Sequence, residues 1–65
     1  MKKLVYKIHK VETETGVTTL VSKGNETEIK NEFTNLKKED GFDYDLSVGW
    51  ELNGKSLGTT LLETK

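Results

Sequence analysis

The side chains that could carry chemistry are few, and His9 is the only imidazole in the chain. Histidine is the one side chain whose ordinary pKa lies near neutrality, so an acid–base or imidazole metal site would have to include it. Lys7 and Lys10 lie close to it, no carboxylate occupies an obvious pairing position, and the chain has no cysteine for a nucleophilic pair. We therefore expect a partly exposed strand histidine, and a protein that is not an enzyme.

A second candidate is the acidic cluster formed by Glu39, Asp40, Asp43 and Asp45. Carboxylate oxygens are the ligands that calcium and magnesium need. The cluster lacks the alternating Asp/Asn ladder, the central glycine and the closing glutamate of an EF-hand loop. We expect these acids to be solvated and to protect a strand edge, with no metal and no cofactor bound.

Glycines provide the third candidate. Gly16, Gly41 and Gly54 are at turn or cap positions, and no GxGxxG or P-loop string is present. Gly49 and Gly58 instead fall inside predicted strands, where a glycine costs roughly 0.5–1 kcal/mol relative to a residue with a side chain. They indicate either a local twist or bulge, or a bare patch that a partner could approach closely.

Composition limits the possible functions further. The 65 residues predict a single domain over residues 1–65, with 32% hydrophobic residues, a net charge of −1 and no cysteine for a disulfide. This charge balance disfavours non-specific binding to nucleic acid. Charged residues interrupt the apolar run after the basic start, so we expect no export signal, no membrane span and a cytoplasmic location.

The clearest structural signal is the strict alternation of residues 42–52, which is followed by Asn53-Gly54. Alternation predicts a half-buried strand, and Asn-Gly supplies the two positive φ angles of a two-residue hairpin turn. The next strand should cover about residues 55–63. A regular hairpin would pair Trp50 with Leu57 and Leu46 with Leu61 as buried pairs, and Gly49 with Gly58.

The first half of the chain predicts another hairpin, from residues 3–12 and 17–23. With Gly16 in a three-residue loop, Val11 would face Thr19 and His9 would face Val21. The string Asn25-Glu26-Thr27-Glu28 is a capping box, so a helix should begin near Glu26 and stop at Gly41. The apolar stripe of that helix would be Ile29, Phe33 and Leu36.

These elements predict an α+β fold of order ββαββ, with one helix packed on one face of a four-stranded sheet made of two hairpins. The element order resembles the β-grasp architecture of the immunoglobulin-binding domains of protein G, in which the terminal strands pair in parallel at the sheet centre. The resemblance covers the whole chain and implies a fold, but it transfers no site. Below the helix we expect Phe42, Tyr44, Leu46, Val48 and Trp50 of one hairpin, and Leu4, Tyr6, Ile8 and Leu20 of the other.

The face without the helix is then the predicted partner-facing surface. Its candidate residues are Val5, His9, Val11, Val17, Val21, Gly49 and Gly58. We expect a protein-interaction module that binds another protein, or a second copy of itself, through this face or a sheet edge. The alternative is a nucleic-acid-binding domain that uses the basic first strand; this reading is disfavoured because the aromatic residues are expected under the helix.

Overall fold

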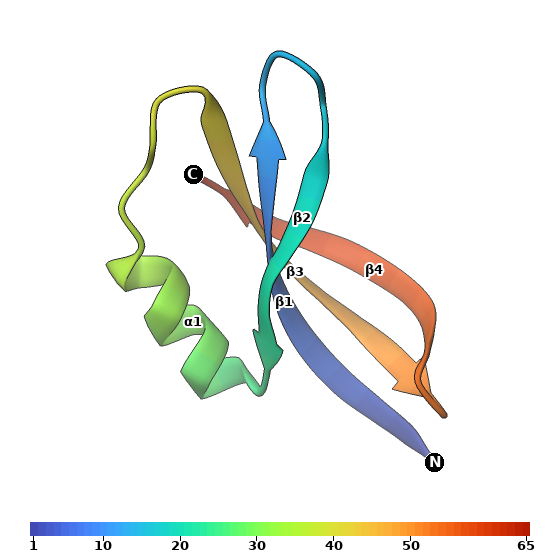
Figure 1. Cartoon of the computed structure of the whole chain (residues 1–65). Coiled ribbons are helices and arrows are strands. Elements are labelled where there is room, and N and C mark those ends of the chain that lie inside the picture. The colour runs from blue at the N-terminus through green and yellow to red at the C-terminus, as the bar shows by residue number, and fades with distance from the viewer.

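The chain folds into one antiparallel sheet with a single helix on one side (Figure 1). The structure, a computed structural model, describes all 65 residues. Its elements are β1 (Lys2–Glu12), β2 (Thr18–Gly24), α1 (Glu26–Asn35), β3 (Phe42–Leu52) and β4 (Lys55–Thr64). The predicted α+β class and ββαββ order are confirmed.

The strand order is β2-β1-β3-β4, and this differs from the β-grasp arrangement. The terminal strands β1 and β4 are not neighbours, and the central pair is β1 with β3, antiparallel. This pair is regular over eleven residues, from Lys2 opposite Leu52 to Glu12 opposite Phe42. The resemblance to the β-grasp architecture therefore does not extend beyond the order of the elements.

The turn between β3 and β4 forms as predicted. Asn53 and Gly54 have φ angles of 52° and 81°, the left-handed values that a two-residue hairpin turn requires. The two pairs next to the turn also match the prediction: Leu52 with Lys55, and Glu51 with Ser56. Local turn chemistry was sufficient to set this end of the hairpin.

Farther from the turn, the predicted register is wrong because β4 carries two bulges. The first places Leu57 and Gly58 together opposite Trp50, and the second lies between the partners of Ser47 and Leu46. Each bulge adds one residue to β4, so the partners of β3 move along the chain. Gly49 pairs with Thr59, Ser47 with Leu61 and Leu46 with Glu63, which replaces the predicted Gly49–Gly58 and Leu46–Leu61 pairs.

Gly49 and Gly58 are nevertheless in close contact, and the first bulge explains both glycines. Gly58 adopts a φ of 146°, which side-chain-bearing residues rarely adopt. A Cβ atom on Gly49 would lie 2.1 Å from the Gly58 carbonyl oxygen. The space beside Gly49 is therefore filled by the backbone of β4.

The first hairpin is also displaced by a bulge. Gly16 takes the expected left-handed conformation, with a φ of 76°. Val11 pairs with Thr18 and His9 with Leu20, one residue from the predicted partners, and the register shifts between His9 and Ile8. Leu20 therefore lies opposite His9 on the helix-free side, where the sequence had not placed it.

The helix begins where the capping box predicts. Asn25 caps it by accepting a hydrogen bond from the Glu28 amide at 2.9 Å. The helix ends at Asn35, well before Gly41, because Leu36 is already extended. The Lys65 ammonium, just after β4, donates to the carbonyls of Phe33 at 2.7 Å, Thr34 at 3.2 Å and Leu36 at 3.0 Å, which satisfies groups that end the helix.

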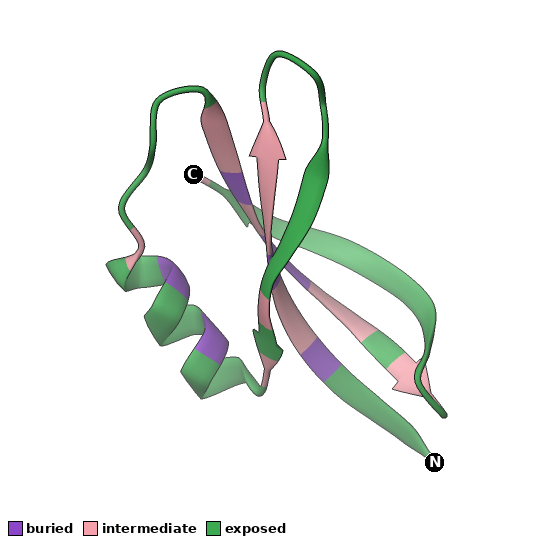
Figure 2. Cartoon of the chain, viewed as in Figure 1, coloured by how far each residue is buried: buried purple, intermediate pink, exposed green.

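The core is small and lies between α1 and the β1–β3 pair. Its members are Ile8, Ile29, Phe33, Tyr44 and Leu46, with Tyr6 and Leu36 packed against them. The buried segments in Figure 2 occur on α1, β1 and β3, whereas β4 is exposed along its whole length. The helix thus covers only part of its side of the sheet.

The contact between Gly49 and Gly58 predicts a strong and local mutational effect. Gly49→Ala should lower the free energy of unfolding by about 3 kcal/mol, the upper end of overpacking costs, because a backbone carbonyl cannot move aside as a side chain can. Urea denaturation measures this difference.

Gly24→Ala is the matched control, because its Cβ would lie at an ordinary 3.6 Å from the side chain of Ile29. It should change stability by no more than about 0.5 kcal/mol. Equal effects of the two substitutions would contradict the bulge geometry.

Candidate functional site

The predicted partner-facing residues lie on several elements and differ widely in exposure. Val5 is only 5% exposed, His9 and Val11 are partly buried, and Val17 and Val21 are exposed. Gly49 is covered by the Gly58 carbonyl, as described above. The helix-free face therefore carries Val5, His9 and Val11 of β1 side by side, but the predicted residues do not form one continuous apolar surface.

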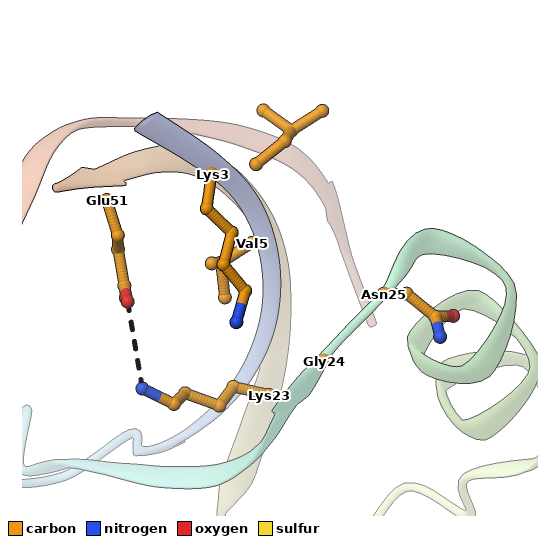
Figure 3. A pocket seen from close by; sticks show the side chains of 7 residues that line it. Lys3, Val5, Lys23, Gly24, Asn25 and Glu51 are labelled. Atoms are coloured by element: carbon orange, nitrogen blue, oxygen red, sulfur yellow. Dashed lines mark ion pairs between the residues drawn. The ribbon is translucent and has the colours of Figure 1, made fainter. Parts of the chain in front are cut away.

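A recess of about 370 Å³ opens at one end of that face (Figure 3). Lys3, Val5, Lys23 and Glu51 are among its lining residues. Glu51 pairs with Lys7 at 3.0 Å and with Lys23 at 3.8 Å, and its side chain is only 13% exposed. Three lysines therefore surround a single carboxylate.

The pKa of the Glu51 carboxyl is lowered from its ordinary 4.5 by this arrangement. The interaction with Lys7 is the largest cause, and the charges of Lys23 and Lys3 act in the same direction, against a smaller opposing effect of desolvation. The charged form of Glu51 is thus favoured in the folded protein.

His9 has a neighbour that the sequence did not reveal. The β1–β3 pairing places Asp45 directly opposite His9, contrary to the expectation that no carboxylate would face it. Both line a shallow groove of about 300 Å³ with Ser47. The Ser47 hydroxyl is buried and makes no hydrogen bond, so His9 is not placed as its general base.

The acidic cluster is distributed among separate partners. Glu39 pairs with Lys10 at 3.2 Å, and Asp43 with Lys38 at 3.3 Å. Asp45 accepts a hydrogen bond from the Thr64 hydroxyl at 3.2 Å. The structure brings together no group of three or more side chains suited to hold a metal ion.

The largest departure from the predicted packing concerns Trp50 and Leu57. The sequence placed Trp50 below the helix in a buried pair, but Trp50 is 49% exposed and Leu57 is 53% exposed. Leu4, opposite Trp50 on β1, is 43% exposed. The prediction fails because α1 packs on Ile8, Tyr44 and Leu46 and does not reach the end of β3 next to the turn (Figure 1).

Beyond the helix, apolar residues of β1, β3 and β4 are left uncovered or partly covered, and we call this group the Trp50 surface. It consists of Leu4, Val48, Trp50, Leu57 and Leu62. The molecule exposes 4661 Å², whereas a compact monomer of 7.4 kDa is expected to expose about 4200 Å². The excess, roughly 450 Å², reflects the elongated shape of the molecule, whose extents are 39 × 24 × 15 Å.

Leu62 of the Trp50 surface also lines a second recess, of about 340 Å³, next to the helix. Its apolar lining comes from Phe33 of α1, Leu46 of β3 and Leu62 of β4. Lys30 of α1 and Glu63 of β4 also line it. The recess is a groove whose two sides are a helix and an edge strand.

The opposite end of the Trp50 surface is basic. The Lys2 ammonium lies 5.9 Å from the Trp50 ring centroid, within the range of a cation–π interaction. Lys55 lies in the next row of the same face, opposite Leu52. Neither lysine forms an ion pair within the chain.

Comparison of the chain with protein-family models, with curated proteins and with solved structures finds no match in any of the three. The one helix, with ten residues, is not long and apolar enough to cross a membrane. The geometry of the side chains is therefore the basis for any functional assignment.

The ion pairs of Glu51 predict a dependence of stability on pH. Because the folded-state pKa lies below 4.5, the contribution is fully present above pH 4.5 and is lost as the pH falls through the lower folded value. Glu51→Gln should therefore unfold more easily than the wild type at pH 7, and the difference should shrink below about pH 4.5. Urea denaturation across this pH range measures it.

Glu14→Gln serves as the control, because Glu14 is exposed and forms no ion pair. It should follow the wild type at every pH. A Glu51→Gln effect that stays constant from pH 7 to pH 3 would show that the charge of Glu51 is not its cause.

Proposed function

We propose that this chain is a non-enzymatic protein-interaction module and that its docking site is the Trp50 surface. The observation that carries the proposal is an exposed tryptophan, flanked by exposed leucines, on the regular ladder of β1 and β3. Tryptophan is enriched among the residues that dominate binding energy at interfaces. A docked partner would remove this surface from water at about 25 cal/mol per Å² of apolar area.

The proposal moves the docking site from the helix-free face to the side that carries α1. On the helix-free face, Val5 is buried and Glu51 is held in ion pairs. On the helix side, Leu4 and Trp50 are adjacent and uncovered. An apolar site of this kind gains more from a partner than a surface of satisfied charges.

Trp50→Glu should abolish partner binding without unfolding the chain, because the side chain is half exposed and lies outside the core cluster. The measurement is capture from an extract of the source cell, followed by identification of the bound proteins. Circular dichroism establishes that the variant is folded.

Val17→Glu is the matched control, since Val17 is 60% exposed but lies outside the Trp50 surface. A specific partner should be captured by the wild type and by this control, and lost with Trp50→Glu. Equal capture by all three proteins would refute the assignment of the docking site.

Single-stranded nucleic acid is a second candidate ligand, because the aromatic residue is not where the sequence placed it. Trp50 is exposed and lies at the end of the sheet that carries Lys2, Lys3 and Lys55. An aromatic ring beside lysines is the arrangement on which bases stack.

Under this second candidate, a single-stranded oligonucleotide should quench the fluorescence of Trp50 at low salt, and the effect should weaken steeply as salt is added. Trp50 is the only tryptophan, so the signal reports on one place. Lys2→Glu should reduce the affinity several-fold. Unchanged fluorescence at low ionic strength would exclude this ligand.

A further inference from the structure

Strand β4 forms one edge of the sheet, and the backbone groups on its outer side have no partner strand. It pairs only with β3 and is exposed along all ten of its residues. An edge strand of this length without proline is a template on which another extended chain can pair. Which chains fit this edge is decided by the spacing of its outward backbone groups.

The hydrogen bonding of β3 identifies those outward groups. Tyr44 exchanges two backbone hydrogen bonds with Lys65, at 3.0 and 2.8 Å, so the backbone groups of Tyr44 face β4. In an antiparallel sheet this direction alternates from one residue to the next. Every second residue from Asp45 to Glu51 therefore bonds to β1, and its partner on β4 points its own N–H and C=O away from β3. These partners are Ser56, Thr59, Leu61 and Thr64.

The two bulges give the outward residues of β4 a symmetric spacing. A regular strand presents outward groups at every second residue. On β4 the steps are three, two and three residues, from 56 to 59, from 59 to 61 and from 61 to 64, because each bulge adds one residue to an outer step. An antiparallel partner must match these steps in reverse order. A regular strand does not match them, whereas a second copy of β4 presents the same three, two and three.

We propose that two copies of this chain pair edge to edge through antiparallel β4 strands, with the twofold axis at Thr60. In this register Thr59 bonds to Leu61 of the second copy, and Ser56 bonds to Thr64 of the second copy. Each bulge then lies opposite a bulge. Bulges on an edge strand normally prevent association, and here they exclude regular strands but accept the copy. The contact is isologous and joins two four-stranded sheets into one.

The side chains that this register brings together are compatible. Thr60 lies opposite Val48, on the side that carries α1, and across the axis it meets Thr60 of the second copy, a favourable cross-strand pair. Lys55 and Glu63 form no ion pair within the chain, and each lies diagonal to the other across the contact. Lys65 lies opposite Lys55, but its ammonium is bound to the carbonyls that end α1.

Sedimentation equilibrium and hydrogen exchange of the whole chain test the contact. A contact between two single strands belongs to the small, weak class of interfaces, so we expect a dimer to form between about 0.1 and 1 mM. Over this range the amides of the outward residues should gain protection, whereas the amides of β2, the other edge strand, should keep their exchange rates. The residues expected to gain protection are Ser56, Thr59, Leu61 and Thr64.

Substitutions at the axis test the register. Thr60→Lys places two like charges opposite each other and should weaken dimerisation at least about tenfold at low salt, and Thr60→Glu should do the same. A mixture of the two variants should restore the dimer, because opposite charges then meet across the axis. Thr19→Lys is the matched control, since Thr19 is an exposed threonine on β2, and it should dimerise like the wild type. Circular dichroism establishes that each variant is folded.

Three outcomes would overturn the inference. A wild type that stays monomeric at about 1 mM, without added protection on β4, would exclude the contact. A mixture that associates no more tightly than either variant alone would exclude pairing at Thr60. A dimer that is lost with Trp50→Glu but kept with Thr60→Lys would place the second copy on the Trp50 surface. The wild-type and Thr60 measurements need no cellular partner, so their result is independent of the proposed function.

Discussion

The pairing of β1 with β3 is the constraint on which the rest of the structure depends. The two strands belong to different hairpins, and their eleven-residue ladder is the only part of the sheet without a register shift. It places Ile8 beside Leu46 below the helix, and Leu4 beside Trp50 beyond it. The same ladder therefore defines both the core and the apolar surface that the core leaves uncovered.

The features that depend on neighbouring residues could be predicted from the sequence. Asn53 and Gly54 favour the positive φ angles of the turn, and Asn25 and Glu28 form the helix cap by themselves, so both features formed where expected. The strands followed from alternation. The pairing of β1 with β3 could not be predicted in this way, because several antiparallel strand orders satisfy the same alternation. The position of Asp45 opposite His9 depends on that pairing, so it could not be predicted either.

The candidate site was less predictable because it depends on how far the helix reaches. Leu36 has the correct spacing to continue the apolar stripe of α1, yet the helix ends before it and Leu36 is extended. The carbonyls at that end are satisfied by Lys65, a contact that no local pattern indicates. Because the helix is short and covers Tyr44 and Leu46 but not the end of β3, Trp50 follows the alternation of the core residues and is nevertheless half exposed.

The contact of Lys65 with the end of α1 links the edge strand β4 to the helix. Lys65 continues the ladder of β4 through mutual backbone hydrogen bonds with Tyr44, while its side chain holds three carbonyls of the helix end. Detachment of the end of β4 would uncap α1 and open the core around Phe33. The edge strand and the helix therefore belong to one cooperative unit, whose amides would gain and lose protection from hydrogen exchange together.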